Sequence, residues 1–151
     1  MRSLGIVGLD YCGSTVVSNV ISSLPGVINV GESHWILDRG LGCRECHNNP
    51  CPVFTRTMLE ELRAADLSKE TWWEVISRFT DAELIVSTDK LPKHYDHFGV
   101  PDNLLFLYKE PKSNIASWCK RKFPLQATDG STFTSDQVDA GVSWWIRISL
   151  S

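Results

Sequence analysis

The chain has 151 residues, of which 42% are hydrophobic and 22% charged, and this composition fits one globular domain with its own core. A formal net charge of −3 argues against general binding to nucleic acid or to an anionic membrane surface. No stretch approaches the roughly 20 apolar residues of a membrane-spanning helix, and the N-terminus lacks a signal-peptide pattern, so we expect a cytoplasmic protein.

Short apolar runs alternate with segments of helical periodicity along the whole sequence. In chain order we predict a strand over 3–8, a helix over 14–24, a strand over 27–30, a loop over 38–52, helices over 53–64 and 68–79, strands over 83–87 and 103–108, and helices over 111–122 and 134–149. Pro-Gly at 25–26 should end the first helix, Ser68 should cap the third, and Pro111 should open the fourth.

This alternation predicts an α/β fold with three layers, in which helices cover both faces of a mainly parallel sheet. We expect a single domain over 1–151. The sequence ends within an apolar run, Val142 to Leu150, with no closing element after it. That ending fits either a domain truncated at its C-terminus or a last helix that covers one face alone.

A glycine-containing loop joins the first predicted strand to the first predicted helix. It runs from Gly8 to Thr15 with the spacing G-x-x-x-x-G-S-T, which is the Walker A pattern with Ser14 in the place of lysine. Glycines allow a tight turn whose N–H groups point together, and the helix start adds unpaired donors and the positive end of its dipole. The loop therefore predicts a P-loop-like site for a phosphate or sulfate group.

The missing lysine narrows the ligand class. In nucleoside triphosphatases that lysine contacts the β- and γ-phosphates, so its absence argues against a triphosphate substrate. A plain strand-to-helix turn remains the alternative for the loop taken alone, because short motifs occur by chance.

Four segments together resemble the sulfotransferases that use 3′-phosphoadenosine 5′-phosphosulfate (PAPS). Residues 12–32, from Cys-Gly-Ser-Thr to Val-Gly-Glu, resemble that family's 5′-phosphosulfate loop, first helix and following strand end. Residues 105–121 resemble its 3′-phosphate segment, and Ile-Val-Ser-Thr-Asp-Lys at 85–90 resembles the strand end between them. Cys-Pro-Val-Phe at 51–54 is similar to an element of some bacterial members.

The resemblance implies a reaction and a set of contacts. It implies transfer of a sulfuryl group from PAPS to a hydroxyl or amine acceptor, with adenosine 3′,5′-bisphosphate as product and no metal required. The cofactor-binding residues that it implies are Tyr11, Cys12, Gly13, Ser14, Thr15, Lys109 and Ser117. The chain departs from the family where Tyr11 replaces a cation, Lys109 replaces arginine and Glu110 replaces aspartate.

The resemblance also places two charged residues at strand ends, where ligands of parallel sheets bind. Glu32 is the candidate general base for the acceptor, with His34 as its rival. Lys90 is the candidate for stabilising charge on the sulfuryl oxygens. Without the resemblance, Glu32 and Lys90 read equally well as solvated surface residues, and His34 as a packed histidine beside Trp35.

Cysteine and histidine cluster in the predicted loop over 38–52. Cys43, Cys46, His47 and Cys51 have a spacing that permits a zinc site, although structural zinc more often uses two separated ligand pairs. In the cytoplasm the five cysteines are expected to be reduced or metal-bound, and plain loop thiols are the leading interpretation. Beside the sulfotransferase, a catalytically impaired nucleotide- or zinc-binding module and a P-loop kinase stay open as alternatives.

Overall fold

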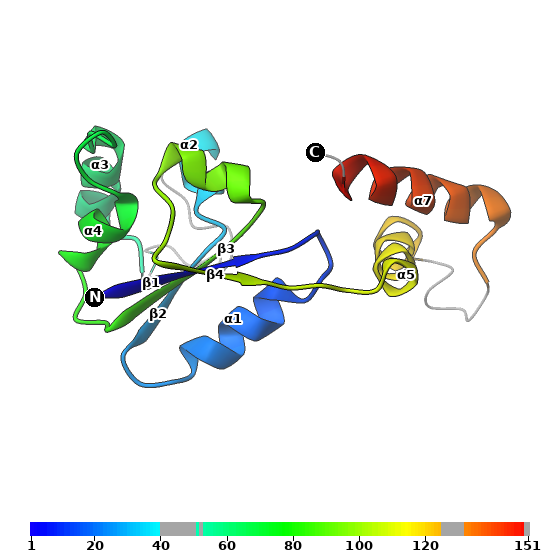
Figure 1. Ribbon diagram of the computed structural model, residues 1–151, viewed down its shortest axis with the longest axis horizontal. Coiled ribbons are helices and arrows are strands. Elements are labelled where there is room, and N and C mark those ends of the chain that lie inside the picture. The colour runs from blue at the N-terminus through cyan, green and yellow to red at the C-terminus, as the bar shows by residue number, and fades with distance from the viewer. Residues whose placement is uncertain (40–50, 52, 125–131, 150–151) are drawn as a thin grey trace. The chain divides into compact units, whose positions relative to one another are not determined.

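The computed structural model describes residues 1–39, 51, 53–124 and 132–149 (Figure 1). The chain divides into two compact units, and each is described by itself below. The first unit comprises Met1–Gly8 and Ser14–Phe106, and the second comprises Leu9–Gly13 and Leu107–Ser151. The expectation of a single domain over 1–151 stays a prediction. None of the described helices is long and apolar enough to cross a membrane.

A four-stranded parallel sheet forms the centre of the first unit. Its strands are β1 (Arg2–Val7), β2 (Val27–Gly31), β3 (Leu84–Lys90) and β4 (Asn103–Phe106), in the spatial order β2-β3-β1-β4. In the middle of the sheet, Leu4 lies opposite Val86 of β3 and Asn103 of β4. Because all strands are parallel, their carboxyl ends lie along one edge, where side chains from different strands can meet.

Helices lie on both sides of this sheet (Figure 1). They are α1 (Ser14–Ser22), α2 (His34–Arg39), α3 (Arg56–Ala64), α4 (Trp72–Ser77) and the 3₁₀ helix η1 (Pro92–His97). Helix α1 covers one side, and α2, α3, α4 and η1 lie on the other. The predicted α/β class with a parallel sheet is thus confirmed.

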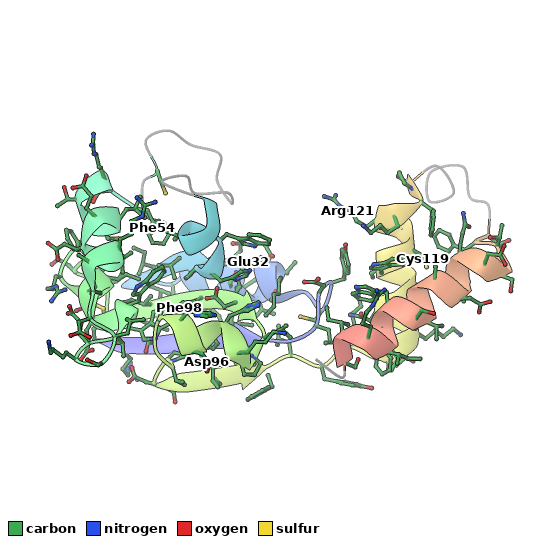
Figure 2. All side chains as sticks on the ribbon, turned by 90° about the horizontal axis from the view of Figure 1, so that it is seen from above. Glu32, Phe54, Asp96, Phe98, Cys119 and Arg121 are labelled. Carbon is green, nitrogen blue, oxygen red and sulfur yellow. The ribbon has the colours of Figure 1, made fainter. Side chains whose placement is uncertain are left out.

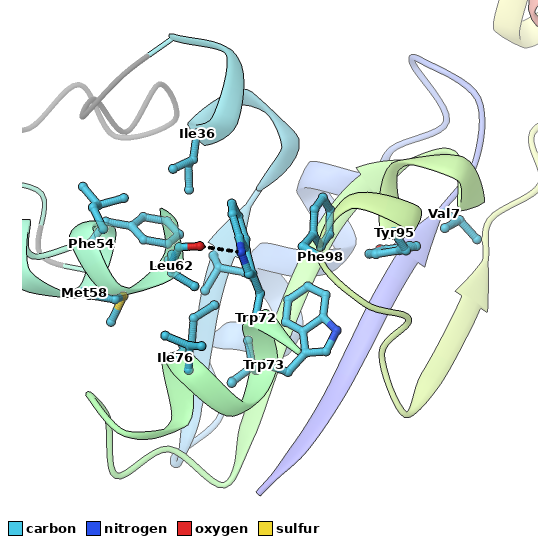
Figure 3. Close-up of a cluster of buried hydrophobic side chains, with 14 residues drawn as sticks. Val7, Ile36, Phe54, Met58, Leu62, Trp72, Trp73, Ile76, Tyr95 and Phe98 are labelled. Atoms are coloured by element: carbon cyan, nitrogen blue, oxygen red, sulfur yellow. Dashed lines mark hydrogen bonds between the residues drawn. The ribbon is translucent and has the colours of Figure 1, made fainter. Parts of the chain in front are cut away.

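The hydrophobic core fills the side of the sheet that faces α2, α3, α4 and η1 (Figure 3). Trp72 and Phe98 stack with ring centroids 5.1 Å apart, and Tyr95 meets Phe98 edge to face at 5.5 Å. The indole of Trp72 donates a 3.0 Å hydrogen bond to the carbonyl of Leu62 on α3. Aromatic side chains therefore join three helical segments to the sheet, with the polar atom of Trp72 satisfied.

The N-terminus of α4 corrects one prediction. Ser68 does not cap this helix; its amide and hydroxyl both donate to Asp66. Thr71 is the N-cap, and it forms a capping box in which its hydroxyl accepts from the Glu74 amide and the Glu74 carboxylate accepts from the Thr71 amide. The hydrogen bonds that the Glu74 carboxylate accepts from the Thr71 amide and, to a lesser extent, from the Thr71 hydroxyl lower the pKa of Glu74.

The second unit is built on α5 (Pro111–Lys122) and α7 (Ser135–Ser149), the two helices predicted over 111–122 and 134–149. They approach closely at Gly141, where an added Cβ would lie 2.8 Å from the Ile115 side chain and 2.9 Å from Cys119 Sγ. Trp118 of α5 stacks on Trp144 of α7 with centroids 5.6 Å apart. Glycine thus permits the close helix packing that buries Cys119.

Three local differences from the sequence prediction affect the site. Strand β3 runs to Lys90, three residues beyond its predicted end, so Asp89 and Lys90 belong to the sheet. Helix α2 begins at His34 and takes in the start of the predicted loop, and η1 was not predicted. The remainder of the loop predicted over 38–52 lies mostly outside the described residues.

Candidate functional site

Two predicted catalytic residues meet at the carboxyl edge of the sheet. The ammonium of Lys90, the last residue of β3, lies 3.0 Å from a carboxylate oxygen of Glu32, which directly follows β2. The same ammonium donates a 2.7 Å hydrogen bond to the hydroxyl of Ser14, the first residue of α1. Lys90 therefore joins the ends of two strands to the start of the helix that follows the β1–α1 loop.

The environment of this group is partly buried. The side chains of Lys90 and Glu32 are 14% and 21% exposed, and Ser14 is 1% exposed. The second carboxylate oxygen of Glu32 accepts a 2.7 Å hydrogen bond from the indole of Trp35. One oxygen of Glu32 (labelled in Figure 2) is thus paired with the ammonium of Lys90 and the other with the indole of Trp35. The carboxylate is still partly exposed to solvent.

The backbone at Lys90 has an unusual conformation. Lys90 has φ of 59°, in the left-handed region that non-glycine residues seldom occupy. Its carbonyl accepts a 2.7 Å bond from the Gly8 amide, and the β1–β3 register shifts at this point. Such backbone conformations cost free energy and persist only where the surrounding structure holds them. They cluster at functional sites.

The loop between β1 and α1 has the tight turn that its glycines predict. Gly13 has φ of 99° and Tyr11 has φ of 64°. Two amide donors of the motif are already engaged, since Gly8 donates to the Lys90 carbonyl and Cys12 donates to the Leu9 carbonyl. The amides in the first turn of α1, which have no preceding helical carbonyls to accept them, are among the donors that remain for an anion.

The predicted 3′-phosphate residues also lie together, in the second unit. The ammonium of Lys109 donates to the hydroxyl of Ser117 at 2.7 Å and to the carbonyl of Tyr11 at 2.9 Å. Lys109 therefore contacts both residue 11 of the β1–α1 loop and helix α5. Thr15, by contrast, lies exposed in the first turn of α1.

Sequence reasoning missed a second connection within this unit. The buried Asn114 of α5 donates a 2.9 Å hydrogen bond to the carbonyl of Asp10 in the loop. Glu110 caps the same helix by accepting from the amides of Ser113 and Lys112, and the amide of Ser113 is the main cause of its lowered pKa. A polar residue three positions after Pro111 was the only signal for the role of Asn114.

The rival base has a different neighbour. The backbone amide and the Nδ1 atom of His34 both lie 2.8 Å from Oδ1 of Asp89, a fully buried carboxylate. His34 is therefore paired with Asp89, whereas Glu32 is paired with Lys90.

The alternative zinc ligands lie in the loop predicted over 38–52. Cys43, Cys46 and His47 are outside the described residues, and the half-buried Cys51 accepts a hydrogen bond from the Phe54 amide at 3.3 Å.

Comparisons with protein-family models, curated proteins and solved structures found no match to this chain.

Proposed function

We propose that this protein is a PAPS-dependent sulfotransferase with a P-loop-like nucleotide site, which moves a sulfuryl group to a hydroxyl or amine acceptor. The observation that carries the proposal is the position of the Lys90 ammonium, within hydrogen-bonding distance of both Ser14 and Glu32. It gives the start of α1 a cation, which the loop sequence itself lacks.

The cation from β3 fits a sulfuryl donor. A lysine within the loop would accompany the β- and γ-phosphates of a triphosphate, whereas a lysine from a neighbouring strand end can contact a single anionic group held at the helix start. The amides and hydroxyls of Ser14 and Thr15 would hold the 5′-phosphosulfate together with Lys90. A P-loop kinase is disfavoured because Ser14 occupies the position of its phosphate-binding lysine.

The second unit offers separate support for a doubly phosphorylated adenosine. Lys109 and Ser117 present a cation and a hydroxyl 2.7 Å apart, next to the carbonyl of Tyr11. A 3′-phosphate would replace the neutral Tyr11 carbonyl as an acceptor for Lys109 and would add a negative charge. Charge-assisted hydrogen bonds of this kind contribute about 1.5–3 kcal/mol each.

In the reaction, Glu32 would accept the proton of the acceptor hydroxyl as its oxygen attacks sulfur. A new oxygen–sulfur bond forms while the bond from sulfur to the bridging phosphate oxygen breaks, and its electron pair leaves with adenosine 3′,5′-bisphosphate. The Lys90 ammonium would offset the charge that develops on the leaving oxygen and the sulfuryl group. The protein's part is positioning and charge stabilisation, as in phosphoryl transfer.

The test is transfer of labelled sulfate from PAPS to a broad acceptor panel. We expect the wild-type chain to label at least one acceptor and Glu32→Gln to lower turnover by about 10²–10⁴-fold, the usual contribution of a general base, while retaining affinity for adenosine 3′,5′-bisphosphate. Unchanged turnover in Glu32→Gln would remove this residue from the mechanism. Bisphosphate binding without transfer to any acceptor would favour the impaired binding module instead.

A further inference from the structure

We propose that His34, Asp89 and His94 form a binding site for a divalent transition-metal ion of the zinc type. The three residues come from the start of α2, the end of β3 and the helix η1, all in the first unit. One donor atom from each residue lies within 4.8 Å of the donor atoms of the other two. This inference is independent of the sulfotransferase proposal.

Both imidazoles turn their Nδ1 atoms towards Asp89. Nδ1 of His34 faces Oδ1 of Asp89, and Nδ1 of His94 faces the backbone carbonyl of Asp89. The two rings stack with centroids 4.0 Å apart and planes 29° apart. Both Nδ1 atoms thus converge on Asp89, and an ion placed there would bind these nitrogens in place of the present hydrogen bonds.

One carboxylate oxygen of this cluster is buried without a hydrogen-bond partner among the described residues. Asp89 is fully buried, and its Oδ2 atom has no hydrogen-bond partner among the residues that the structure describes. A buried carboxylate oxygen without a partner is costly, and a bound cation is one of the explanations that such an atom calls for. A metal ion held by the two histidines would satisfy it.

The donor set selects the class of ion. Calcium and magnesium prefer sites made of oxygen atoms alone, whereas two imidazoles with one carboxylate suit zinc and its first-row neighbours. Zinc lies about 2.0–2.2 Å from such ligands, so small side-chain rotations would be needed to close the present spacing.

The ion would act on the edge that carries the candidate catalytic pair. Asp89 immediately precedes Lys90 in β3, and His34 lies two residues after Glu32. A metal held by His34 and Asp89 would therefore tie the end of β2 to the end of β3. We assign it this positioning role and no step in sulfuryl transfer.

The test is titration of the full chain with Co²⁺, followed by visible absorption and by competition with Zn²⁺. The background carries Cys43, Cys46 and Cys51 replaced by serine, so that thiolate binding in the cysteine loop cannot contribute. His94→Ala and His34→Ala remove one ligand each, and His97→Ala, an exposed histidine of the same η1 helix, is the matched control. Asp89→Asn is a poor probe because Asp89 also binds the His34 amide.

We expect one Co²⁺ per chain, displaced by Zn²⁺, with the absorption of a site that lacks sulfur ligands. Loss of even an outer partner costs about 10–100-fold in metal affinity, so His94→Ala and His34→Ala should each weaken binding by about 100-fold while His97→Ala does not. The site is refuted if the background with the three serine substitutions binds no Co²⁺, or if binding persists unchanged in both histidine variants. Circular dichroism of each variant distinguishes lost binding from lost folding.

Discussion

The contact between Lys90 and Glu32 predicts a measurable coupling energy. Lys90→Met removes the ammonium and leaves a partly buried carboxylate without its charged partner. Adding Glu32→Gln to this variant removes the unpaired carboxylate charge as well. The double variant should therefore be more stable than the sum of the two single effects implies. This non-additivity is what a double-mutant cycle isolates.

The expected magnitude follows from distance and burial. Two unit charges about 4 Å apart attract by roughly 4 kcal/mol at an effective dielectric constant of about 20, and desolvation of both groups offsets much of this. Since the two side chains are 14% and 21% exposed, solvent screens them less than it screens a surface pair. We predict a coupling of about 1–2 kcal/mol, compared with a median of about 0–1 kcal/mol for exposed pairs.

The assay is urea unfolding at neutral pH, followed by circular dichroism and by tryptophan fluorescence so that coincident curves support a two-state treatment. The Arg56–Glu60 pair is the matched control, because its atoms are also 3.0 Å apart but its side chains are 83% and 58% exposed. Its coupling should be about 0.3–0.5 kcal/mol. A Lys90–Glu32 coupling no larger than that of the control would refute the reasoning from burial.

Two further predictions concern the nucleotide and pH. Lys109→Met should weaken binding of adenosine 3′,5′-bisphosphate about tenfold or more in calorimetry, because one charge-assisted bond contributes about 1.5–3 kcal/mol, while the exposed neighbour Lys112→Met should change it little; equal effects would deny Lys109 its special role. The lowered pKa of Glu74 means that its cap stabilises α4 above the ordinary pKa of glutamate and stops doing so as pH falls through the lower folded-state pKa. Glu74→Gln should accordingly be less stable than wild type in urea at neutral pH and converge with it in strong acid, and a pH-independent difference would contradict the linkage.

Much of the fold follows from local signals. The four strands are short apolar runs, and Pro111 and the apolar spacing marked α5 and α1 closely. Helices α2 and η1, of six residues each, were not predicted. The cap of α4 was readable, since Thr71 is followed by glutamate three positions later, which is the capping-box spacing.

Of the site, the sequence predicted only the residues that follow or end the parallel strands. Parallel strands place Glu32 and Lys90 on one edge, and the structure brings them together. Contacts between residues far apart in sequence, such as Asn114 with Asp10, depend on packing that no local pattern encodes. The same is true of His34 and Asp89, which meet only because β3 continues past its predicted end.

Calorimetry shows whether the chain binds a doubly phosphorylated adenosine, on which the proposed sulfotransferase depends. Adenosine 3′,5′-bisphosphate and ATP with Mg²⁺ should be titrated into the same preparation. We expect saturable binding of the bisphosphate without any metal and little or no heat from ATP. Binding of ATP as tight as that of the bisphosphate, or no binding of the bisphosphate at all, would contradict it.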